Sequence, residues 1–303
     1  MRSMRWVHPR IEVPMSNILR TIFRHPLGKR APLASLSRYV RWQIGSRVLG
    51  MPVVVPFVND SCLVAEPGMT GATGNIYFGL QEYEDMAFVG HALREAELFV
   101  DVGANIGSYS VLAAAGPKAR VIACEPVPAT YRRLQRNIEA NHFAHEVTTK
   151  QIAASDRVGE VRMTDDLDTM NRVTSDGPGA VVRAMPLDVL LADEKPVVMK
   201  IDVEGYEPAV IAGAEAVLRN PSLLAVVMEV PSEGPIAALD AVFRKCGFTL
   251  HHYDPDARIL IPGSRGSNAI YARMKSDLAE RLRNAKPLRV GSLSLRIVAS
   301  TEE

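Results

Sequence analysis

The chain has 303 residues, which is enough for one large α/β domain with an appendage. Hydrophobic residues make up 47% of it and charged residues 23%, values that are typical of globular proteins and exclude a disordered or fibrous chain. The formal net charge is +1.

The sequence lacks the features of a membrane-spanning or exported protein. Its apolar runs fall short of the ~20 residues that cross a bilayer. Charges and prolines interrupt the N-terminus, where a secretion signal would need an apolar segment. Cys62, Cys124 and Cys246 are too far apart in sequence to indicate a zinc site or a disulfide framework. We therefore expect the chain to work in a reducing compartment, the cytoplasm.

Positive charge is concentrated at the start of the chain. Residues 1–50 hold ten Lys and Arg and one acid, Glu12, and so carry +9, whereas the remainder carries −8. We expect a helical appendage whose arginines face solvent. A peripheral contact of residues 1–50 with an anionic membrane, at its inner face, is a second hypothesis. An acidic partner, nucleic acid or a transit sequence are further alternatives, and of these we expect no nucleic-acid partner.

The appendage is predicted to span residues 1–75, followed by an α/β domain over 76–285 and a tail over 286–303. Amphipathic periodicity and turn residues indicate the first elements. They are helices over 16–24 and 33–48 with breakers at 25–32 between them, strands over 51–58 and 61–65, a loop over 67–74 and a helix over 82–95.

From residue 97 onward, apolar strands alternate with helices, which indicates βαβ units and a mostly parallel sheet covered on both faces. No helix lies between the last two strands, so one of them is expected to run antiparallel. The predicted strands are 97–102, 120–125, 147–153, 197–202, 223–230, 248–253 and 268–273, and the helices between them are 107–115, 128–140, 207–218 and 235–246. The segment 161–185, which contains Asp165, Asp166 and Asp168, is longer than a connection requires and is expected to form a lid or substrate wall.

The first of these strands ends at Asp101 and leads into a glycine loop with Gly103, Asn105 and Gly107. In an open α/β sheet the ligand binds beyond the carboxyl ends of the strands. The loop is not G-x-G-x-x-G, and a carboxylate here would repel a pyrophosphate. The same carboxylate would attract the α-ammonium group of a methionine moiety. We therefore favour a cofactor with a sulfonium cation.

Two further acids follow the next strands. Glu125 lies 22 residues after Gly103, near the ~20-residue separation expected for an acid that binds a ribose diol. The alternative is a cap of the next helix. Asp156 follows the third strand and is expected to accept a hydrogen bond from an adenine amino group, with an ordinary turn aspartate as the equal alternative.

Asp202 and Glu204 end the fourth strand and are the predicted catalytic residues. One would hold the sulfonium end of the cofactor, and the other would orient or deprotonate an incoming hydroxyl group. Glu204 has the alternative role of capping the helix near Glu207. Further candidates for the general base are Glu229, His251 and His252. Asp202 and Glu229 also offer oxygen ligands for a divalent cation, but we expect no metal site.

Taken in order, these motifs resemble the FkbM family of S-adenosylmethionine-dependent methyltransferases. The resemblance covers roughly residues 76–230. It implies a class I methyltransferase fold, a Rossmann-like sheet of seven strands, and O-methylation of a hydroxyl group on a sugar, glycolipid or polyketide-like acceptor. The motifs are Phe99-Val-Asp-Val-Gly-Ala-Asn-Ile-Gly107, Ile122-Ala-Cys-Glu-Pro126, Ala153-Ala-Ser-Asp156, Pro186-Leu-Asp188 and Lys200-Ile-Asp-Val-Glu-Gly205.

The resemblance also implies roles for individual residues. Glu125 would hold the ribose, Asp156 the adenine, and Asp202 the floor of the reacting centre. Tyr206 stands where the family more often has a small residue, and it is expected to shape the acceptor pocket. The residues expected to line the methionine end of S-adenosylmethionine are Asp101, Gly103, Asn105 and Gly107.

Three other functions remain open from the sequence. An NAD-dependent oxidoreductase or epimerase fits the position of Glu125 but not the glycine loop or Asp101. An adaptor without activity would be expected to have lost cofactor residues, and here every expected position is filled. An N-methyltransferase would use the same cofactor site. The sequence names neither the acceptor nor the oligomeric state.

Overall fold

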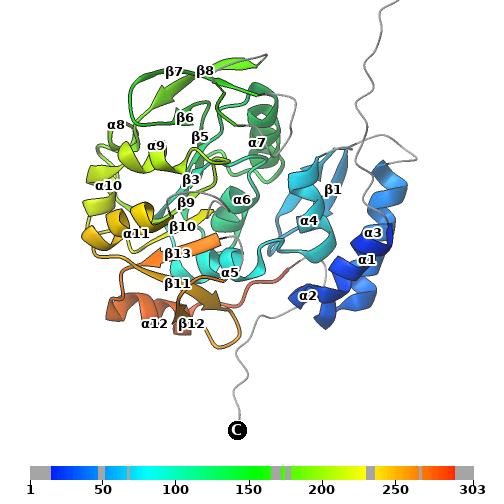
Figure 1. Ribbon diagram of the computed structural model, residues 1–303. Coiled ribbons are helices and arrows are strands. Elements are labelled where there is room, and N and C mark those ends of the chain that lie inside the picture. The colour runs from blue at the N-terminus through cyan, green and yellow to red at the C-terminus, as the bar shows by residue number, and fades with distance from the viewer. Residues whose placement is uncertain are drawn as a thin grey trace, which may run out of the picture.

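The computed structural model describes residues 15–46, 52–66, 69–164, 172–174, 179–229, 236–265 and 268–290 (Figure 1). A central sheet of eight strands forms the middle of the molecule, in the order β12-β11-β13-β10-β9-β3-β4-β5. The strands are β3 (Leu98–Val102), β4 (Arg120–Cys124), β5 (Val147–Lys150), β9 (Pro196–Ile201), β10 (Ala225–Glu229), β11 (Thr249–Asp254), β12 (Ile259–Pro262) and β13 (Asn268–Ala272).

The strand directions confirm the predicted doubly wound sheet and its ending. The neighbours from β10 through β9, β3 and β4 to β5 are all parallel. β13 runs antiparallel between β10 and β11. The seven predicted strands are confirmed in type. β12 is an additional edge strand that pairs with β11 across a short turn, in a region where no strand or helix is predicted from the sequence.

Helices cover both faces of the sheet (Figure 1). Both faces need cover because successive side chains of each strand point to opposite faces and are mostly apolar on both. In β3, Phe99 packs into the core on one face, whereas Val100 and Val102 pack into the core on the other. The helices on the first face are α5 (Tyr83–Ala92), α6 (Ser108–Ala115), α7 (Pro128–Ala140) and α12 (Ser276–Asn284). Those on the second face are α8 (Leu187–Leu190), α9 (Glu207–Ala212), α10 (Glu215–Arg219) and α11 (Ile236–Lys245).

The predicted helix over 207–218 is two helices, α9 and α10, which separate at Gly213. A Cβ atom at Gly213 would lie 2.0 Å from the Ser155 carbonyl oxygen. The chain therefore makes a backbone-to-backbone contact at this point that a larger residue would prevent. Periodicity alone did not reveal this contact, because Ser155 comes from a distant loop.

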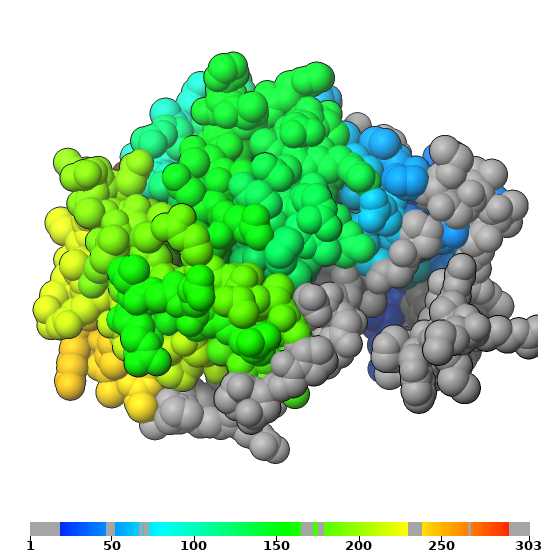
Figure 2. Space-filling model, turned by 90° about the horizontal axis from the view of Figure 1, so that it is seen from above, coloured from blue at the N-terminus to red at the C-terminus, as the bar shows by residue number. Residues whose placement is uncertain are grey.

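The N-terminal elements pack against one side of this core. They are α1 (Met15–Arg24), α2 (Pro26–Arg30), α3 (Pro32–Ile44), β1 (Val53–Pro56), β2 (Cys62–Ala65) and α4 (Thr70–Phe78). The helices α1 and α3 and the antiparallel strand pair confirm the prediction. In the space-filling view these elements, in blue, form one end of the molecule (Figure 2). Ile22, Tyr39 and Trp42 are buried in a cluster that also contains Ile106 of the glycine loop.

Two predictions for this region are wrong. The breaker-rich segment 25–32 contains the short helix α2, which His25 caps by accepting a hydrogen bond from the Leu27 amide. The expected loop over 67–74 is helical from Thr70 onward. Glycine disfavours helix on its own, but at Gly74 the absence of a side chain leaves room for Gln81, whose Oε1 would lie 2.4 Å from a Cβ atom. Tertiary packing therefore overrides local propensity.

The segment between β5 and β9 forms a small sheet of its own. Its strands are β6 (Ala153–Ala154), β7 (Gly159–Met163) and β8 (Ala180–Met185), in the order β6-β8-β7. The acids Asp165, Asp166 and Asp168 lie outside the described residues. Met163 and Val173 reach the main pocket, so this segment contributes to a pocket wall.

The division into appendage, α/β domain and tail stays a prediction. α4 continues across residue 75 without a break. At the other end, Leu288 and Val290 are buried, and Val290 forms a β-bridge with Val58. Within the described parts of the chain, no helix is both long and apolar enough to cross a membrane.

Candidate functional site

A cavity of about 300 Å³ opens at the carboxyl ends of β3, β4, β9 and β10. This edge is where an open α/β sheet binds its ligand. The polar residues that line the cavity and enter the argument below are Asn75, Gln81, Glu82, Asp101, Asn105, Tyr109, Glu125, Lys200, Asp202, Glu204, Tyr206, Glu229 and Asn268.

The glycine loop approaches the neighbouring strand end more closely than any side chain would permit. Gly103 has a φ of 78°, and a Cβ atom on it would lie 1.8 Å from the Asp202 carbonyl oxygen. Asn105 has a φ of 51°, and its Oδ1 accepts a hydrogen bond from the Ile106 amide at 2.8 Å. Asparagine tolerates this left-handed backbone because its short side chain bonds locally. The loop therefore presents bare backbone to the cavity.

Glu125 fastens this loop to the next helix. Its Oε2 accepts a hydrogen bond from the Asn105 amide and its Oε1 accepts one from the Val127 amide, both at 2.9 Å. Burial raises the pKa of the carboxyl group to about 7. Each carboxylate oxygen keeps a second lone pair, so the group can also accept bonds from a ligand. Glu125 thus shapes the loop in addition to facing the cavity.

Asp101 and Lys200 lie side by side under the cavity floor. Ser110 Oγ donates a 2.6 Å hydrogen bond to Asp101 Oδ2, and burial raises the pKa of this carboxyl group. Lys200 Nζ lies 2.5 Å from Asp202 Oδ2. Burial would lower the pKa of the Lys200 ammonium, but the carboxylates of Asp202, Glu82 and Asp101 together raise it above its ordinary value. The lysine therefore stays charged and holds Asp202.

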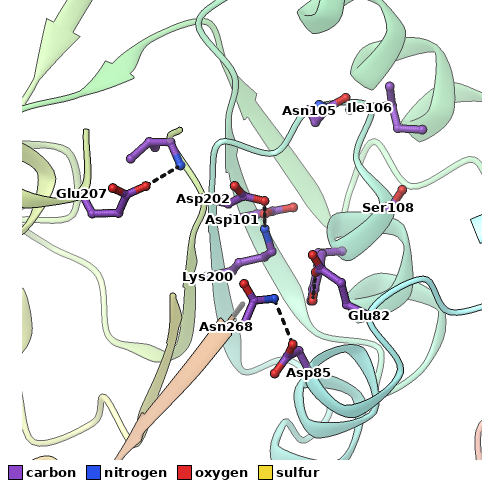
Figure 3. A network of polar contacts seen from close by, with 12 residues as sticks. Glu82, Asp85, Asp101, Asn105, Ile106, Ser108, Lys200, Asp202, Glu207 and Asn268 are labelled. Atoms are coloured by element: carbon purple, nitrogen blue, oxygen red, sulfur yellow. Dashed lines mark hydrogen bonds and ion pairs between the residues drawn. The ribbon is translucent and has the colours of Figure 1, made fainter. Parts of the chain in front are cut away.

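The same lysine connects the strand ends to the segment before β3 (Figure 3). Its ammonium lies 4.7 Å from the centroid of the Tyr109 ring, a cation–π contact. Tyr109 Oη donates a 2.5 Å hydrogen bond to Glu82 Oε2. Nearby, Asn268 Nδ2 donates to Asp85 Oδ2 at 2.9 Å, and burial raises the pKa of Asp85 to about 7. One network therefore links α5, β9 and β13.

Three carboxylates meet at the ends of β9 and β10. Asp202, Glu204 and Glu229 each offer an oxygen, and these oxygens lie within 4.8 Å of one another. Partial burial and then the charges of Asp202 and Glu204 raise the pKa of Glu229 to about 7. Partial burial and then the charge of Asp202 also raise the pKa of Glu204. Such a group can accept a proton from a hydroxyl group, or hold a hard cation.

Six of the eight residues predicted to bind the cofactor or act in catalysis line the cavity, and so does Glu229, a further candidate for the general base. Gly107 caps α6 instead, and a Cβ atom on it would lie 2.6 Å from Leu134 Cδ1. Asp156 is exposed and accepts a hydrogen bond from Ser155 Oγ. Neither histidine of the pair at 251–252 lines the cavity. The six that do are Asp101, Gly103, Asn105, Glu125, Asp202 and Glu204.

Sequence reasoning missed the wall that precedes the glycine loop. Asn75, Gln81 and Glu82 line the cavity from α4 and from the turn before α5. No motif marks them: Asn75 lies at the predicted end of the appendage, Gln81 outside the predicted elements and Glu82 at the start of a predicted helix. The one available signal was the polar pair Gln81-Glu82 at the start of a helix whose remaining residues are mostly apolar. Tyr206, singled out in the sequence, does line the cavity, and its hydroxyl lies 3.1 Å from Ser155 Oγ.

Comparison with known proteins agrees with this geometry. Residues 101–250 match the family model of the methyltransferase FkbM domain. The 31-O-demethyl-FK506 methyltransferase FkbM of Streptomyces tacrolimicus is 30% identical over 209 residues, which cover 55% of this chain and 79% of that protein. The hexuronic acid methyltransferase AglP of Haloferax volcanii is 28% identical over 138 residues, 44% of this chain and 56% of that protein.

Two solved structures to which the chain has a weak likeness are distant from it in sequence. Precorrin-6y C5,15-methyltransferase from Geobacter metallireducens is 15% identical, with a TM-score of 0.39 over 65% of this chain and 89% of that one. An S-adenosylmethionine-dependent O-methyltransferase from Thermotoga maritima is 14% identical, with a TM-score of 0.36 over 62% of this chain and 63% of that one. The family match and the match to the Streptomyces protein decide the assignment. The chain belongs to the FkbM family of S-adenosylmethionine-dependent methyltransferases.

Proposed function

We propose that the protein transfers a methyl group from S-adenosylmethionine to a hydroxyl group of an uncharged, polyhydroxylated acceptor, such as a sugar, a glycolipid headgroup or a polyketide ring. One observation carries this proposal. The glycine-loop cavity continues without a break into a group of strand-end carboxylates, and one of these, Glu229, has a pKa of about 7. A carboxylate of that pKa suits the removal of a hydroxyl proton near neutral pH.

In this proposal the cofactor lies along the glycine loop. Bare backbone at Gly103 lets a ligand approach, and the charges of Asp101 and Asp202 favour a cationic methionine end. Glu125 has lone pairs left for a ribose diol. The cofactor supplies a methyl carbon already activated by its positive sulfur. The protein's own task is to align the acceptor oxygen with that carbon and exclude water.

We assign the proton-accepting role to Glu229 rather than to the two carboxylates named from the sequence. Asp202 is held by the Lys200 ammonium at 2.5 Å, so one of its carboxylate oxygens is already engaged as a hydrogen-bond acceptor. Its role is to position the reacting groups. Glu204 stands beside Glu229 with a raised pKa. It serves as a hydrogen-bond acceptor for the acceptor molecule and keeps Glu229 basic through like-charge repulsion.

The charges at the acceptor end argue for an uncharged molecule. Glu82, Glu204 and Glu229 line this end, while Asp202 is matched by Lys200. A carboxylate on the acceptor would face net negative charge, which is unfavourable in a partly buried cavity. The carboxamides of Asn75, Gln81 and Asn268 offer hydrogen bonds to hydroxyl groups. Of the chemistry named for the two relatives, hydroxyl methylation fits this cavity better than methylation of a hexuronic acid.

An acceptor panel tests the proposal. The purified protein is incubated with S-adenosylmethionine and neutral hexosides, hexuronates, amino sugars or cyclohexanol-type ring alcohols, and S-adenosylhomocysteine formation is measured. Methylated products are located by mass spectrometry. We expect turnover with neutral hydroxyl acceptors and little with hexuronates. Preference for hexuronates, or methylation at nitrogen of the amino sugars, would contradict the proposal.

A further inference from the structure

The helix α3 presents an apolar stripe to the outside of the molecule. Its inner side buries Ser35, Tyr39 and Trp42, as expected for a helix that packs on a core. Leu33, Val40 and Ile44 nevertheless have exposures of 82%, 45% and 55%. Their spacings of seven and four residues place them on one line along the opposite side of the helix. We call these three residues the outer stripe.

Exposed apolar side chains are concentrated in this part of the chain. The large hydrophobic residues exposed in the described segments number eleven, and five of them lie between Phe23 and Val54. Three of these five are the outer stripe, and the remaining two are Phe23 on α1 and Val54 on β1. Single exposed hydrophobic residues are common on any surface, but a concentration of them marks an interaction site.

The helices α1, α2 and α3 carry basic side chains and no acidic ones. No Asp or Glu occurs between Glu12 and Asp60. Over the same stretch, exposed basic side chains extend from α1 through α2 to α3, and Arg41 lies directly beside Val40. They are Arg20, Arg24, Lys29 and Arg41; Arg30 on α2 is exposed as well, but it pairs with Asp256.

We propose that the outer stripe and these four basic side chains dock the protein on a lipid bilayer that contains anionic phospholipids. Aliphatic side chains enter the boundary between headgroups and acyl chains, and neighbouring Lys and Arg pair with anionic headgroups. A second copy of the chain is a poor occupant, because it would bring two predominantly basic faces together. Membrane docking therefore explains both the exposed apolar residues and the charge.

The docking surface is firmly connected to the active site. The His25 ring stacks on Phe78 with ring centroids 4.3 Å apart, and Gln43 Nε2 donates to Tyr77 Oη at 3.1 Å. Both partners belong to α4, the helix that supplies Asn75 to the cavity. A bilayer bound by α3 would thus lie at a fixed position relative to the cavity.

Vesicle co-sedimentation of the full chain tests this inference. The vesicles are phosphatidylcholine alone or phosphatidylcholine mixed with phosphatidylglycerol, at low and high salt. We expect binding only to the anionic vesicles, weakened by salt. The variant Leu33→Ser/Val40→Ser/Ile44→Ser should bind them at least ~10-fold more weakly. Exchanging Arg20, Arg24, Lys29 and Arg41 for Gln should have a similar effect.

A matched control carries the same change on another surface, Val158→Ser/Val181→Ser/Val189→Ser, all exposed residues of the opposite part of the molecule. It should bind as the wild type does, and thermal unfolding verifies that every variant is folded. Equal vesicle binding by the α3 variant and the wild type would overturn the proposal. So would a wild-type dimer that the α3 variant abolishes in sedimentation velocity, or binding to RNA rather than to anionic vesicles.

Discussion

The raised pKa of the Glu229 carboxyl group results from its surroundings. It ends β10 beside Asp202 and Glu204, so its ionised form is disfavoured by both partial burial and like charge. Lys200 offsets only part of this, because its ammonium lies 2.5 Å from Asp202 instead. A side chain that would be fully ionised in water therefore titrates near neutral pH.

The variant Glu229→Gln tests this role. The wild-type turnover rate should rise as the pH passes about 7, because the Glu229 carboxyl group must be deprotonated to accept the hydroxyl proton. The variant should lose ~100-fold or more in turnover, with the rise near neutral pH abolished and cofactor affinity retained. Glu204→Gln serves as control and should lower the rate less, with the rise in rate retained but moved to lower pH because one charge that raises the pKa of Glu229 is removed. A Glu229→Gln enzyme with wild-type turnover would exclude this residue as the base.

Individual site residues could be predicted only where a strand end marked them. Asp101, Glu125 and Asp202 were found because each ends a recognisable apolar strand. Glu82 and Asn268 were missed, because they reach the cavity from the turn before α5 and from β13, at opposite ends of the catalytic region. Their contribution depends on the tertiary arrangement, which joins Asn268 to Asp85 across 183 residues of sequence.

At the level of elements, the turn from β3 into α6 depends on a close approach between backbones. Gly103 and Gly205 both have a positive φ, 78° and 90°. They differ in space, because a Cβ atom at Gly103 would meet the Asp202 carbonyl oxygen whereas one at Gly205 would meet nothing within 4 Å. Alanine at Gly205 would therefore cause backbone strain alone, whereas alanine at Gly103 would cause the same strain and a steric clash as well.

The pair Gly103→Ala and Gly205→Ala uses this difference. Gly205→Ala should cost about 1 kcal/mol in free energy of unfolding, since only the left-handed backbone is strained. Gly103→Ala should cost about 3 kcal/mol, because overpacking against a backbone atom is added, and it should also weaken S-adenosylhomocysteine binding. Urea unfolding and calorimetric titration measure the two effects. Equal losses at both positions would show that the close approach is unimportant.

Helices and strands were predictable where the same hydrophobic pattern continued over many residues. The strand–helix alternation from residue 97 gave the seven strands in type and the antiparallel ending. Prediction failed at α4, where glycines predict a loop but Gly74 accommodates Gln81, and at β12, whose four residues form a strand only by pairing with β11. Both elements depend on a neighbour that local sequence does not reveal.

Across the whole molecule, basic side chains are concentrated in the N-terminal helices and acidic side chains at the ends of the central strands. The helix α3 exposes the outer stripe to solvent, and the acidic strand ends line the cavity. The cluster that contains Ile22, Trp42 and Ile106 joins the two. The sequence indicated both charge groups but not their connection, since that follows from the packing of α1 and α3 behind the glycine loop.

The central claim is that the cavity between Asp101 and Glu125 holds the methyl donor. Calorimetric titration with S-adenosylhomocysteine tests it most directly, using wild type, Glu125→Gln and, as a control, Glu160→Gln on an exposed face of β7. We expect one binding site per chain, no binding of NAD, an affinity at least ~10-fold lower for Glu125→Gln, and wild-type affinity for the control. Binding of NAD without S-adenosylhomocysteine, or unchanged affinity in Glu125→Gln, would contradict the account.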